Sequence, residues 1–316
     1  MKILANDGIS KAGQEALEAK GFEVITAHVA QEQLENYIND KGVEVLLVRS
    51  ATKVRQALID ATNLKIIGRG GVGMDNIDVD YARGKGIQVI NTPASSSQSV
   101  AEFVMAHLFS IVRNLHQANR SMPLEGDSNF NGLKKAYAKA TELRGKTLGV
   151  IGFGRIGVEV IREAIGLGMN ILVYDKFPAT REIELDFFDG QKLTFTITSV
   201  GFDEVISNAD FITLHVPSQD GYILGEKEFA KMKDGVIVIN TARGGVVDEK
   251  ALVDAIEDGK VAGAALDVFE NEPSPEMGLL MNESLSLSPH IAGSTNEAQD
   301  RIGTELAAQI VEIYGK

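Results

Sequence analysis

The feature that most constrains this chain is a strand–turn–helix–strand unit that runs from Lys146 to Asp175. A short apolar strand, Thr147–Ile151, leads into a turn that reads GFGRIG at residues 152–157. Apolar residues then recur at helical spacing, and a second strand, Asn170–Tyr174, ends directly before Asp175. This order predicts two parallel strands joined by a crossover helix whose N-terminus lies at the glycine turn.

The glycines of this turn fit the binding of a dinucleotide, each for a different reason. Gly152 permits the tight turn, Gly154 lets the backbone approach a pyrophosphate, and Gly157 lets helix and strand pack closely. The helix N-terminus offers free N–H groups and partial positive charge to the phosphates, and Arg155 adds a charge at that end. The cofactor contacts predicted from this unit are Gly152, Gly154, Arg155, Ile156, Gly157 and Asp175.

Asp175 indicates which dinucleotide binds. An acidic residue about 20 residues after the glycines, at the end of the second strand, can accept a hydrogen bond from a ribose 2′-hydroxyl. Its charge would repel a 2′-phosphate, and no arginine follows it directly, although Lys176 does. The predicted cofactor is therefore NAD rather than NADP.

A second match to the glycine pattern, GRGGVG at residues 68–73, lacks this context. It follows a strand expected at Leu64–Ile67, but the residues after Gly73 show no clear helical apolar period. The surrounding sequence therefore assigns the dinucleotide to the turn at residues 152–157.

Short apolar strands alternate with amphipathic helices along the chain, which is typical of parallel α/β sheets. Strands are expected in two sets: Lys2–Ala5, Glu23–Thr26, Val43–Val48, Leu64–Ile67 and Gln88–Ile90, then Thr147–Ile151, Asn170–Tyr174, Phe211–Leu214, Val236–Asn240, Gly263–Leu266 and Leu285–Leu287. One long helix, Ser99–Arg120, is expected between the sets, and a C-terminal helix, Thr295–Tyr314, is expected to return to the first. The predicted fold class is α/β, with two Rossmann-like or flavodoxin-like parallel-sheet domains and an interdomain active-site cleft.

One segment interrupts this alternation. Glu182–Phe188 and Gln191–Thr198 each alternate apolar and polar residues, with Asp189-Gly190 between them. This pattern predicts a β-hairpin. We expect it to rim the adenine end of the cofactor site or a dimer surface.

The composition limits the possible partners. A net charge of −13 argues against binding to nucleic acid or to an anionic membrane surface. Because the protein is negatively charged, the binding of an anionic ligand requires local positive charge from well-placed arginines. The lack of cysteine excludes disulfides, thiolate metal sites and cysteine nucleophiles, and no pair of histidines has metal-ligand spacing, so no metal is expected. The sequence shows no secretory signal and no apolar run as long as a membrane span, so a cytoplasmic location is expected.

Arg243, Glu272 and His290 each lie shortly after a different candidate strand of the second set, where open α/β sheets place their ligands. An arginine can fork onto the carboxylate and carbonyl of a 2-oxo acid. A histidine can exchange a proton near neutral pH, and a neighbouring carboxylate would fix its ring. The spacing alone leaves open whether the three meet. His28, His107 and His116 are expected to be structural or exposed. His215 follows a strand and could touch the cofactor, but a structural role is expected for it.

The sequence resembles the D-isomer-specific 2-hydroxyacid dehydrogenases over nearly its whole length. The resemblance is carried by GIQVINTP at residues 86–93, LRGKTLGVIGFGRIG at 143–157, INTARGG at 239–245, ALDVF at 265–269 and SPHIA at 288–292. It implies that Arg243, Glu272 and His290 are the catalytic set, with His290 as the acid–base group.

The resemblance also implies an organisation and further contacts. Residues 1–97 and 291–316 would form a discontinuous substrate-binding domain, residues 98–290 an NAD-binding Rossmann domain, and two chains a homodimer built on the latter. Asp267 is expected near the nicotinamide carboxamide. The implied cofactor contacts outside the glycine unit are Val72, Val100, Val216, Thr241 and Asp267.

Within the family, VRSATKV at residues 48–54 and GRGGVGMDNID at 68–78 are most similar to phosphoglycerate dehydrogenases without a C-terminal regulatory domain. The glycines at 68–73 would then form a substrate loop, with Arg49 and Arg69 for the carboxylate and phosphate. The implied substrate contacts are Arg49, Ser50, Arg69, Gly70, Gly71 and Lys135. The implied reaction is NAD-dependent oxidation of D-3-phosphoglycerate to 3-phosphohydroxypyruvate, in serine biosynthesis. Alternatives are a hydroxypyruvate or glyoxylate reductase, another D-2-hydroxyacid dehydrogenase, or an NAD-sensing corepressor-like binding protein.

Overall fold

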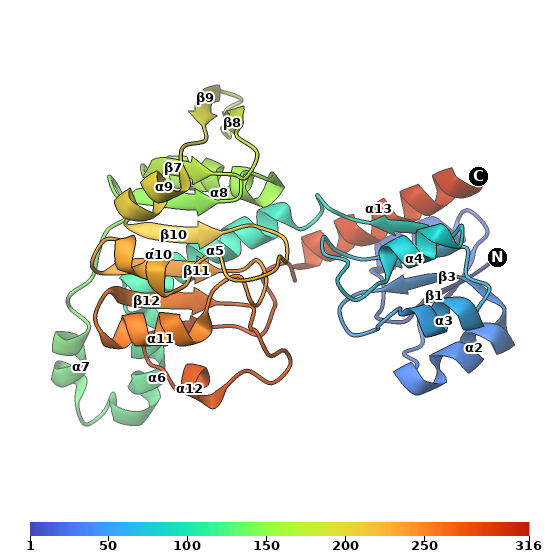
Figure 1. Cartoon of the computed structure of the whole chain (residues 1–316), viewed down its shortest axis with the longest axis horizontal. Helices are drawn as coiled ribbons and strands as arrows, with labels where there is room; N and C mark the ends of the chain where they lie inside the picture. The colour runs from blue at the N-terminus through green and yellow to red at the C-terminus, as the bar shows by residue number, and fades with distance from the viewer. Residues whose placement is uncertain (316) are drawn as a thin grey trace. The chain divides into compact units, whose positions relative to one another are not determined.

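The computed structural model describes residues 1–315 and divides into two compact units (Figure 1). The first consists of Met1–Ser97 together with the residues from Gly293 onward, and the second of Gln98–Ala292. Each contains a parallel sheet with helices on both faces, which confirms the predicted α/β class. Among the described residues, no helix is both long enough and apolar enough to cross a membrane.

The sheet of the first unit has the strand order β2-β1-β3-β4-β5, and neighbouring strands run parallel. Its strands are β1 (Lys2–Ala5), β2 (Glu23–Ile25), β3 (Val43–Val48), β4 (Ile66–Arg69) and β5 (Gln88–Asn91). One face is covered by α2 (Leu34–Lys41), α3 (Gln56–Ala61) and α4 (Val79–Gly84), and the other by α1 (Lys11–Glu18) and α13 (Asn296–Tyr314). Because both faces are covered, the strands read as nearly continuous apolar runs.

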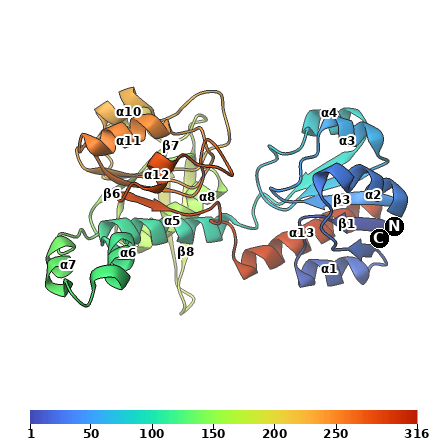
Figure 2. The same ribbon diagram turned by 90° about the horizontal axis from the view of Figure 1, so that it is seen from below.

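Helices α1 and α13 lie side by side although they come from opposite ends of the chain (Figure 2). Glycines make this contact close, since a Cβ added to Gly13 would lie 2.6 Å from the backbone of Gly303. Ile302, Leu306 and Ile310 of α13 pack in the apolar cluster on that face of the sheet. The C-terminal helix is therefore part of the core of the first unit.

The sheet of the second unit has the order β13-β12-β11-β10-β6-β7, again with parallel neighbours. Its strands are β6 (Thr147–Ile151), β7 (Asn170–Tyr174), β10 (Phe211–Leu214), β11 (Val236–Asn240), β12 (Val261–Leu266) and β13 (Leu285–Leu287). One face is covered by α9 (Phe202–Asn208), α10 (Glu226–Lys231) and α11 (Glu249–Glu257). The other face is covered by α5 (Ser97–Val112) and α8 (Arg155–Gly166). Three further helices are peripheral: α6 (Leu115–Glu125), α7 (Phe130–Ala136) and α12 (Met277–Leu280). Because the strands are parallel, their carboxyl ends lie along one edge.

The prediction of one helix over Ser99–Arg120 is wrong, because the structure divides this segment between α5 and α6. Asn114 lies between the two helices with a φ of 53°, a left-handed conformation that asparagine tolerates better than most residues. Its side-chain amide donates to the carbonyls of Tyr137 and Lys139. These partners come from a distant segment, so the apolar pattern of the helix itself did not reveal the break.

The predicted β-hairpin is confirmed. β8 (Thr180–Asp186) and β9 (Lys192–Thr198) pair antiparallel in a sheet of their own. Gly190 adopts a φ of 85° in the connecting turn, a conformation that favours glycine. Ile183 and Leu185 of β8 are buried in the same apolar cluster as α8, so the hairpin is anchored to the second unit.

Candidate active site

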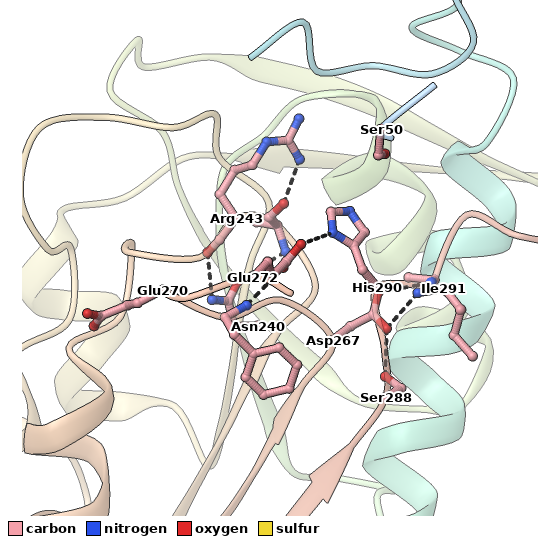
Figure 3. A network of polar contacts seen from close by, with 12 residues as sticks. Ser50, Asn240, Arg243, Asp267, Glu270, Glu272, Ser288, His290 and Ile291 are labelled. Carbon is pink, nitrogen blue, oxygen red and sulfur yellow. Dashed lines mark hydrogen bonds and ion pairs between the residues drawn. The ribbon is translucent and has the colours of Figure 1, made fainter. Parts of the chain in front are cut away.

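The carboxyl edge of the second sheet gathers the polar residues singled out in the sequence. The glycine turn follows β6, Asp175 follows β7, and Arg243 follows β11. Glu272 and His290 lie after β12 and β13, and Figure 3 shows Arg243, Glu272 and His290 close to one another at this edge. One edge therefore combines a dinucleotide-type turn with side chains suited to anion binding and proton transfer.

The turn at residues 152–157 requires glycine at two positions for steric reasons. Gly152 has a φ of 108°, and a Cβ there would lie 2.3 Å from the carbonyl oxygen of His215. A Cβ on Gly157 would lie 2.1 Å from the carbonyl oxygen of Gly152. At Gly154, by contrast, none of the described residues beyond its chain neighbours comes within 4 Å of an added Cβ. This open space at the N-terminus of α8 fits a pyrophosphate held by backbone N–H groups.

Alanine at two of these glycines is expected to separate cofactor binding from folding. Gly154→Ala should leave the melting temperature unchanged but raise the Kd for NAD about tenfold, or about 1.4 kcal/mol, because the methyl group occupies the pyrophosphate space. Gly157→Ala should lower the free energy of unfolding by about 1–3 kcal/mol, because the turn and α8 must move apart. Calorimetric titration and thermal melting measure the two effects. Equal losses of stability would contradict this division.

Asp175 also fixes the geometry of the turn. Its Oδ2 accepts a hydrogen bond of 2.7 Å from the N–H of Phe153, and its Oδ1 accepts one of 2.9 Å from the N–H of Phe177. The carboxylate therefore joins the end of β7 to the glycine turn, a role that the sequence motif did not reveal. Each oxygen keeps a further lone pair that can accept from a ribose hydroxyl.

The hairpin brings an arginine to the same turn. The guanidinium carbon of Arg181 lies 5.2 Å from the ring centroid of Phe153, whose side chain is fully buried. Sequence reasoning missed this residue because its position depends on how β8 packs against α8. The structure thus adds a cation beside the glycine turn.

The remaining predicted cofactor contacts are distributed between the two units. Val216 follows β10 and lies beside the glycine turn, and Ile156 packs in the cluster under α8. Thr241 is buried, and its hydroxyl has no hydrogen-bond partner among the described residues. Because buried polar groups are normally hydrogen-bonded, this hydroxyl fits a contact with a bound ligand. Val100 is buried on α5, whereas Val72 is exposed in the first unit.

His215 follows β10 and is unsuited to proton transfer. Burial lowers the pKa of its imidazole to about 3, so the ring is neutral at physiological pH. Its Nε2 lies 3.0 Å from the hydroxyl of Thr213. This geometry agrees with the structural role expected for His215.

His290 and Glu272 form a hydrogen-bonded pair (Figure 3). Nδ1 of His290 lies 2.9 Å from Oε2 of Glu272, and Oε1 of Glu272 accepts a hydrogen bond of 3.0 Å from the N–H of Phe269. His290 has a φ of 55°, which is uncommon for residues other than glycine. Because Nδ1 faces the carboxylate, Nε2 is the ring nitrogen that can exchange a proton with a substrate.

Arg243 extends from a braced turn. The side chain of Asn240 accepts from the N–H of Ala242 at 3.0 Å and donates to the carbonyl of Arg243 at 2.9 Å. The guanidinium of Arg243 donates to the carbonyl of Ala242 at 2.6 Å. A Cβ on Gly244 would lie 1.8 Å from the carbonyl oxygen of Phe269, so the turn lies directly against the segment after β12. This close approach places Arg243 beside the segment that carries the carboxylate partner of the histidine.

The first unit brings together most of the residues predicted to bind substrate. Nη2 of Arg69, at the end of β4, lies 3.3 Å from the hydroxyl of Ser50, which follows β3. Gly70 and Gly71 are buried beside them, and a Cβ on Gly71 would lie 2.0 Å from Nη1 of Arg69. Glycine is therefore required for the arginine to adopt this position.

Asp7, which sequence reasoning missed, organises the neighbouring segment. Its carboxylate accepts hydrogen bonds from the N–H groups of Arg49 and Thr52, at 2.6 and 3.1 Å. Burial lowers the pKa of the Arg49 guanidinium, and the negative charge of Asp7 opposes that shift. The remaining predicted substrate contact, Lys135, is exposed on α7 in the second unit.

Comparison with known proteins identifies relatives over the full length of the chain. Residues 105–292 match the family model "D-isomer specific 2-hydroxyacid dehydrogenase, NAD binding domain". A hydroxypyruvate reductase of Thermotoga maritima is 42% identical, over 99% of this chain and 98% of the relative. D-3-phosphoglycerate dehydrogenases of Archaeoglobus fulgidus and Methanocaldococcus jannaschii are each 43% identical over 99% of this chain, which spans only 57% of their length.

Solved structures show the same fold. A glyoxylate reductase from Paecilomyes thermophila superimposes with a TM-score of 0.82 at 31% identity, covering 100% of this chain and 95% of that chain. A D-lactate dehydrogenase from Escherichia coli gives a TM-score of 0.80 at 26% identity, covering 100% and 98%.

Proposed function

Because this chain belongs to the family of D-isomer-specific 2-hydroxyacid dehydrogenases and is an NAD-dependent enzyme, we propose that it oxidises D-3-phosphoglycerate to 3-phosphohydroxypyruvate. The observation that supports this substrate is that the guanidinium of Arg69 lies beside the hydroxyl of Ser50, at the strand ends of the first unit. Arg49 directly precedes Ser50 in the sequence. A substrate with a carboxylate and a phosphate needs two cations, which an acidic protein has to supply locally.

The proposed chemistry uses His290 as the base in the oxidative direction. The hydroxyl proton of the substrate passes to Nε2 of His290 while the hydrogen on C2 leaves with its electron pair. NAD, when bound, supplies the hydride acceptor. Glu272 holds the ring through Nδ1 and places a negative charge beside the imidazolium that forms. The products are a 2-oxo acid, reduced cofactor and a proton that His290 later releases.

Substrate and cofactor positions are proposed from the same geometry. Arg243 would fork onto the substrate carboxylate and the C2 oxygen, and Arg49 and Arg69 would bind the carboxylate and the phosphate. Lys135 would supply a further cation to the substrate of the neighbouring subunit. The proposed contacts of NAD are Gly152, Gly154, Arg155, Ile156, Gly157, Asp175, Val216, Thr241, Asp267, Val72 and Val100.

Asp175→Ala should relax the preference for NAD over NADP. The loss of a charge-assisted hydrogen bond to the ribose, about 1.5–3 kcal/mol, should raise the Kd for NAD about tenfold to a hundredfold, while repulsion of the 2′-phosphate disappears. Asp175→Asn is the control, because it removes the charge but keeps an acceptor for the N–H of Phe153. Steady-state kcat/KM with each cofactor gives the ratio, and an unchanged ratio in both variants would refute the ribose role.

A reductase acting on hydroxypyruvate or glyoxylate is the second candidate. The observation in its favour is that the Thermotoga maritima hydroxypyruvate reductase is 42% identical over 99% of this chain, nearly the same identity as the phosphoglycerate dehydrogenases at 43%. Both candidates use the same hydride and proton transfers, so the catalytic residues do not distinguish them.

Substrate kinetics test the choice. The kcat/KM of the enzyme would be measured with D-3-phosphoglycerate and NAD, and in the reverse direction with 3-phosphohydroxypyruvate, hydroxypyruvate, glyoxylate and pyruvate. We expect the phosphorylated pair to give the highest values. A preference for hydroxypyruvate over its phosphorylated form would reject the proposed substrate in favour of the second candidate.

We also propose a homodimer formed by the second unit. Large apolar side chains are exposed on its peripheral helices, namely Leu115, Met122 and Leu124 on α6 and Phe130 on α7. A cluster of exposed apolar side chains is typical of a protein–protein interface. Light scattering should give twice the chain mass of 34.0 kDa, and the mass of a single chain would contradict the dimer.

A further inference from the structure

His107 is a buried residue of α5 whose two ring nitrogens are both hydrogen-bonded. Nδ1 lies 2.9 Å from Oγ of Ser286, and Nε2 lies 3.0 Å from Oγ of Ser288. The ring also packs edge-on against Phe103, with 4.7 Å between centroids. Burial lowers the pKa of His107, so the ring is neutral at physiological pH. Ser286 lies in β13, and Ser288 lies in the short segment that leads from β13 to His290.

The direction of these hydrogen bonds follows from the single proton of a hydroxyl group. Ser288 Oγ donates to Oδ1 of Asp267 at 2.6 Å, so it can only accept from His107. Nε2 of His107 therefore carries the ring proton, and Nδ1 accepts from the hydroxyl of Ser286. The hydrogen bonds thus run in one direction, from His107 through Ser288 to Asp267.

Asp267 extends this chain to the residues directly after His290 (Figure 3). Its carboxylate is fully buried, and it accepts hydrogen bonds from the N–H groups of Ile291 and Ala292, each at 2.9 Å. His290 itself has a φ of 55°, a conformation that persists where the surrounding structure imposes it. The backbone on the C-terminal side of the strained residue is thus fixed by one buried carboxylate.

We propose that His107 is a positioning residue, which acts through Ser288 and Asp267 to keep the imidazole of His290 against Glu272. His107 lies on a different element from the catalytic groups, and its bonds end on the backbone that carries His290. A misplacement of about 1 Å at a reacting group can lower the rate about a hundredfold. The loss of these hydrogen bonds is therefore expected to lower kcat. The inference rests on the proposed acid–base role of His290.

Three substitutions of His107 in the full chain test this series of hydrogen bonds. A glutamine amide reaches the position of Nε2 and can donate to Ser288, whereas an asparagine amide reaches only the position of Nδ1, and leucine provides neither group. We expect His107→Leu and His107→Asn to lower kcat about tenfold to a hundredfold, with the KM for substrate unchanged. His107→Gln should keep most of the parent kcat.

The two serines form a matched pair of controls. Ser286→Ala removes the bond on the other side of the ring and should leave kcat unchanged, whereas Ser288→Ala should lower kcat as much as His107→Leu. Because they interrupt the same chain, the His107→Leu and Ser288→Ala losses should not add in the double variant. Amide hydrogen exchange at Ile291 and Ala292 should become faster in each variant with low kcat.

Several outcomes would overturn the proposal. These are a parent-like kcat in His107→Leu, equal losses from Ser286→Ala and Ser288→Ala, or a His107→Gln enzyme no faster than His107→Asn. If His107→Leu does not fold, the comparison of glutamine with asparagine decides. A His290→Gln enzyme with normal turnover would reject the acid–base role instead, and the exchange rates at Ile291 and Ala292 would then still report whether His107 holds this segment.

Discussion

His290→Gln is expected to lower kcat by about 10²–10⁴-fold and to leave the Kd for NAD unchanged. A glutamine side chain places its neutral amide at the position of Nε2, but it cannot take up the hydroxyl proton of the substrate. The glycine turn and Asp175, which are proposed to bind the cofactor, belong to other segments of the sheet edge. Steady-state kinetics and calorimetric titration with NAD measure the two quantities.

His116→Gln is the matched control for this result. Its ring nitrogens face the backbone carbonyls of Ser110 and Glu283, away from the proposed site, so kcat should remain that of the parent. Near-normal turnover in His290→Gln would mean that another group exchanges the proton. A similar loss in the His116 variant would show that the effect is not specific to the proposed site.

Arg243→Gln is expected to lower kcat/KM by about 10²–10⁴-fold. The substitution removes two charge-assisted hydrogen bonds to the substrate, each worth about 1.5–3 kcal/mol, and each 1.36 kcal/mol corresponds to a factor of about ten. The fold should tolerate the change, because the turn is braced by Asn240 through backbone groups and by the contact of Gly244 with Phe269. Kinetics with saturating NAD, together with thermal melting, separate binding from stability.

Arg243→Lys sharpens the comparison. Lysine keeps the positive charge but loses the planar fork, so its kcat/KM should fall between those of the parent and Arg243→Gln. If Arg243→Lys has the kcat/KM of the parent, a single positive charge is sufficient. The proposed contact of Arg243 with both the carboxylate and the C2 oxygen would then be rejected. An unchanged kcat/KM in Arg243→Gln would mean that the substrate carboxylate binds elsewhere.

The parts of the fold that depend on local sequence were predictable. The alternation of strands and helices and the hairpin at β8 and β9 follow from apolar periodicity and from turn residues such as Gly190. The glycine turn was separated from the similar run at residues 68–73 by the helix that follows it. Arg243, Glu272 and His290 could be proposed because parallel strands bring their carboxyl ends to one edge.

Contacts between distant segments were not predictable. The break at Asn114 depends on the carbonyls of Tyr137 and Lys139, which no helical pattern encodes. Asp267 was expected near the nicotinamide, and no sequence pattern indicated that its carboxylate holds the backbone after His290. Such roles depend on the directions of individual side chains, which are set by packing rather than by residue type.

The transfer of deuterium from C2 of D-3-phosphoglycerate to NAD is the most direct test of the proposed reaction. The enzyme would be incubated with NAD and with either isomer of the substrate deuterated at C2, and the mass of the reduced cofactor would be measured. We expect the D isomer to yield reduced cofactor that carries deuterium and the L isomer to yield none. Reduced cofactor without deuterium, or deuterium transferred from the L isomer, would contradict the proposed hydride transfer.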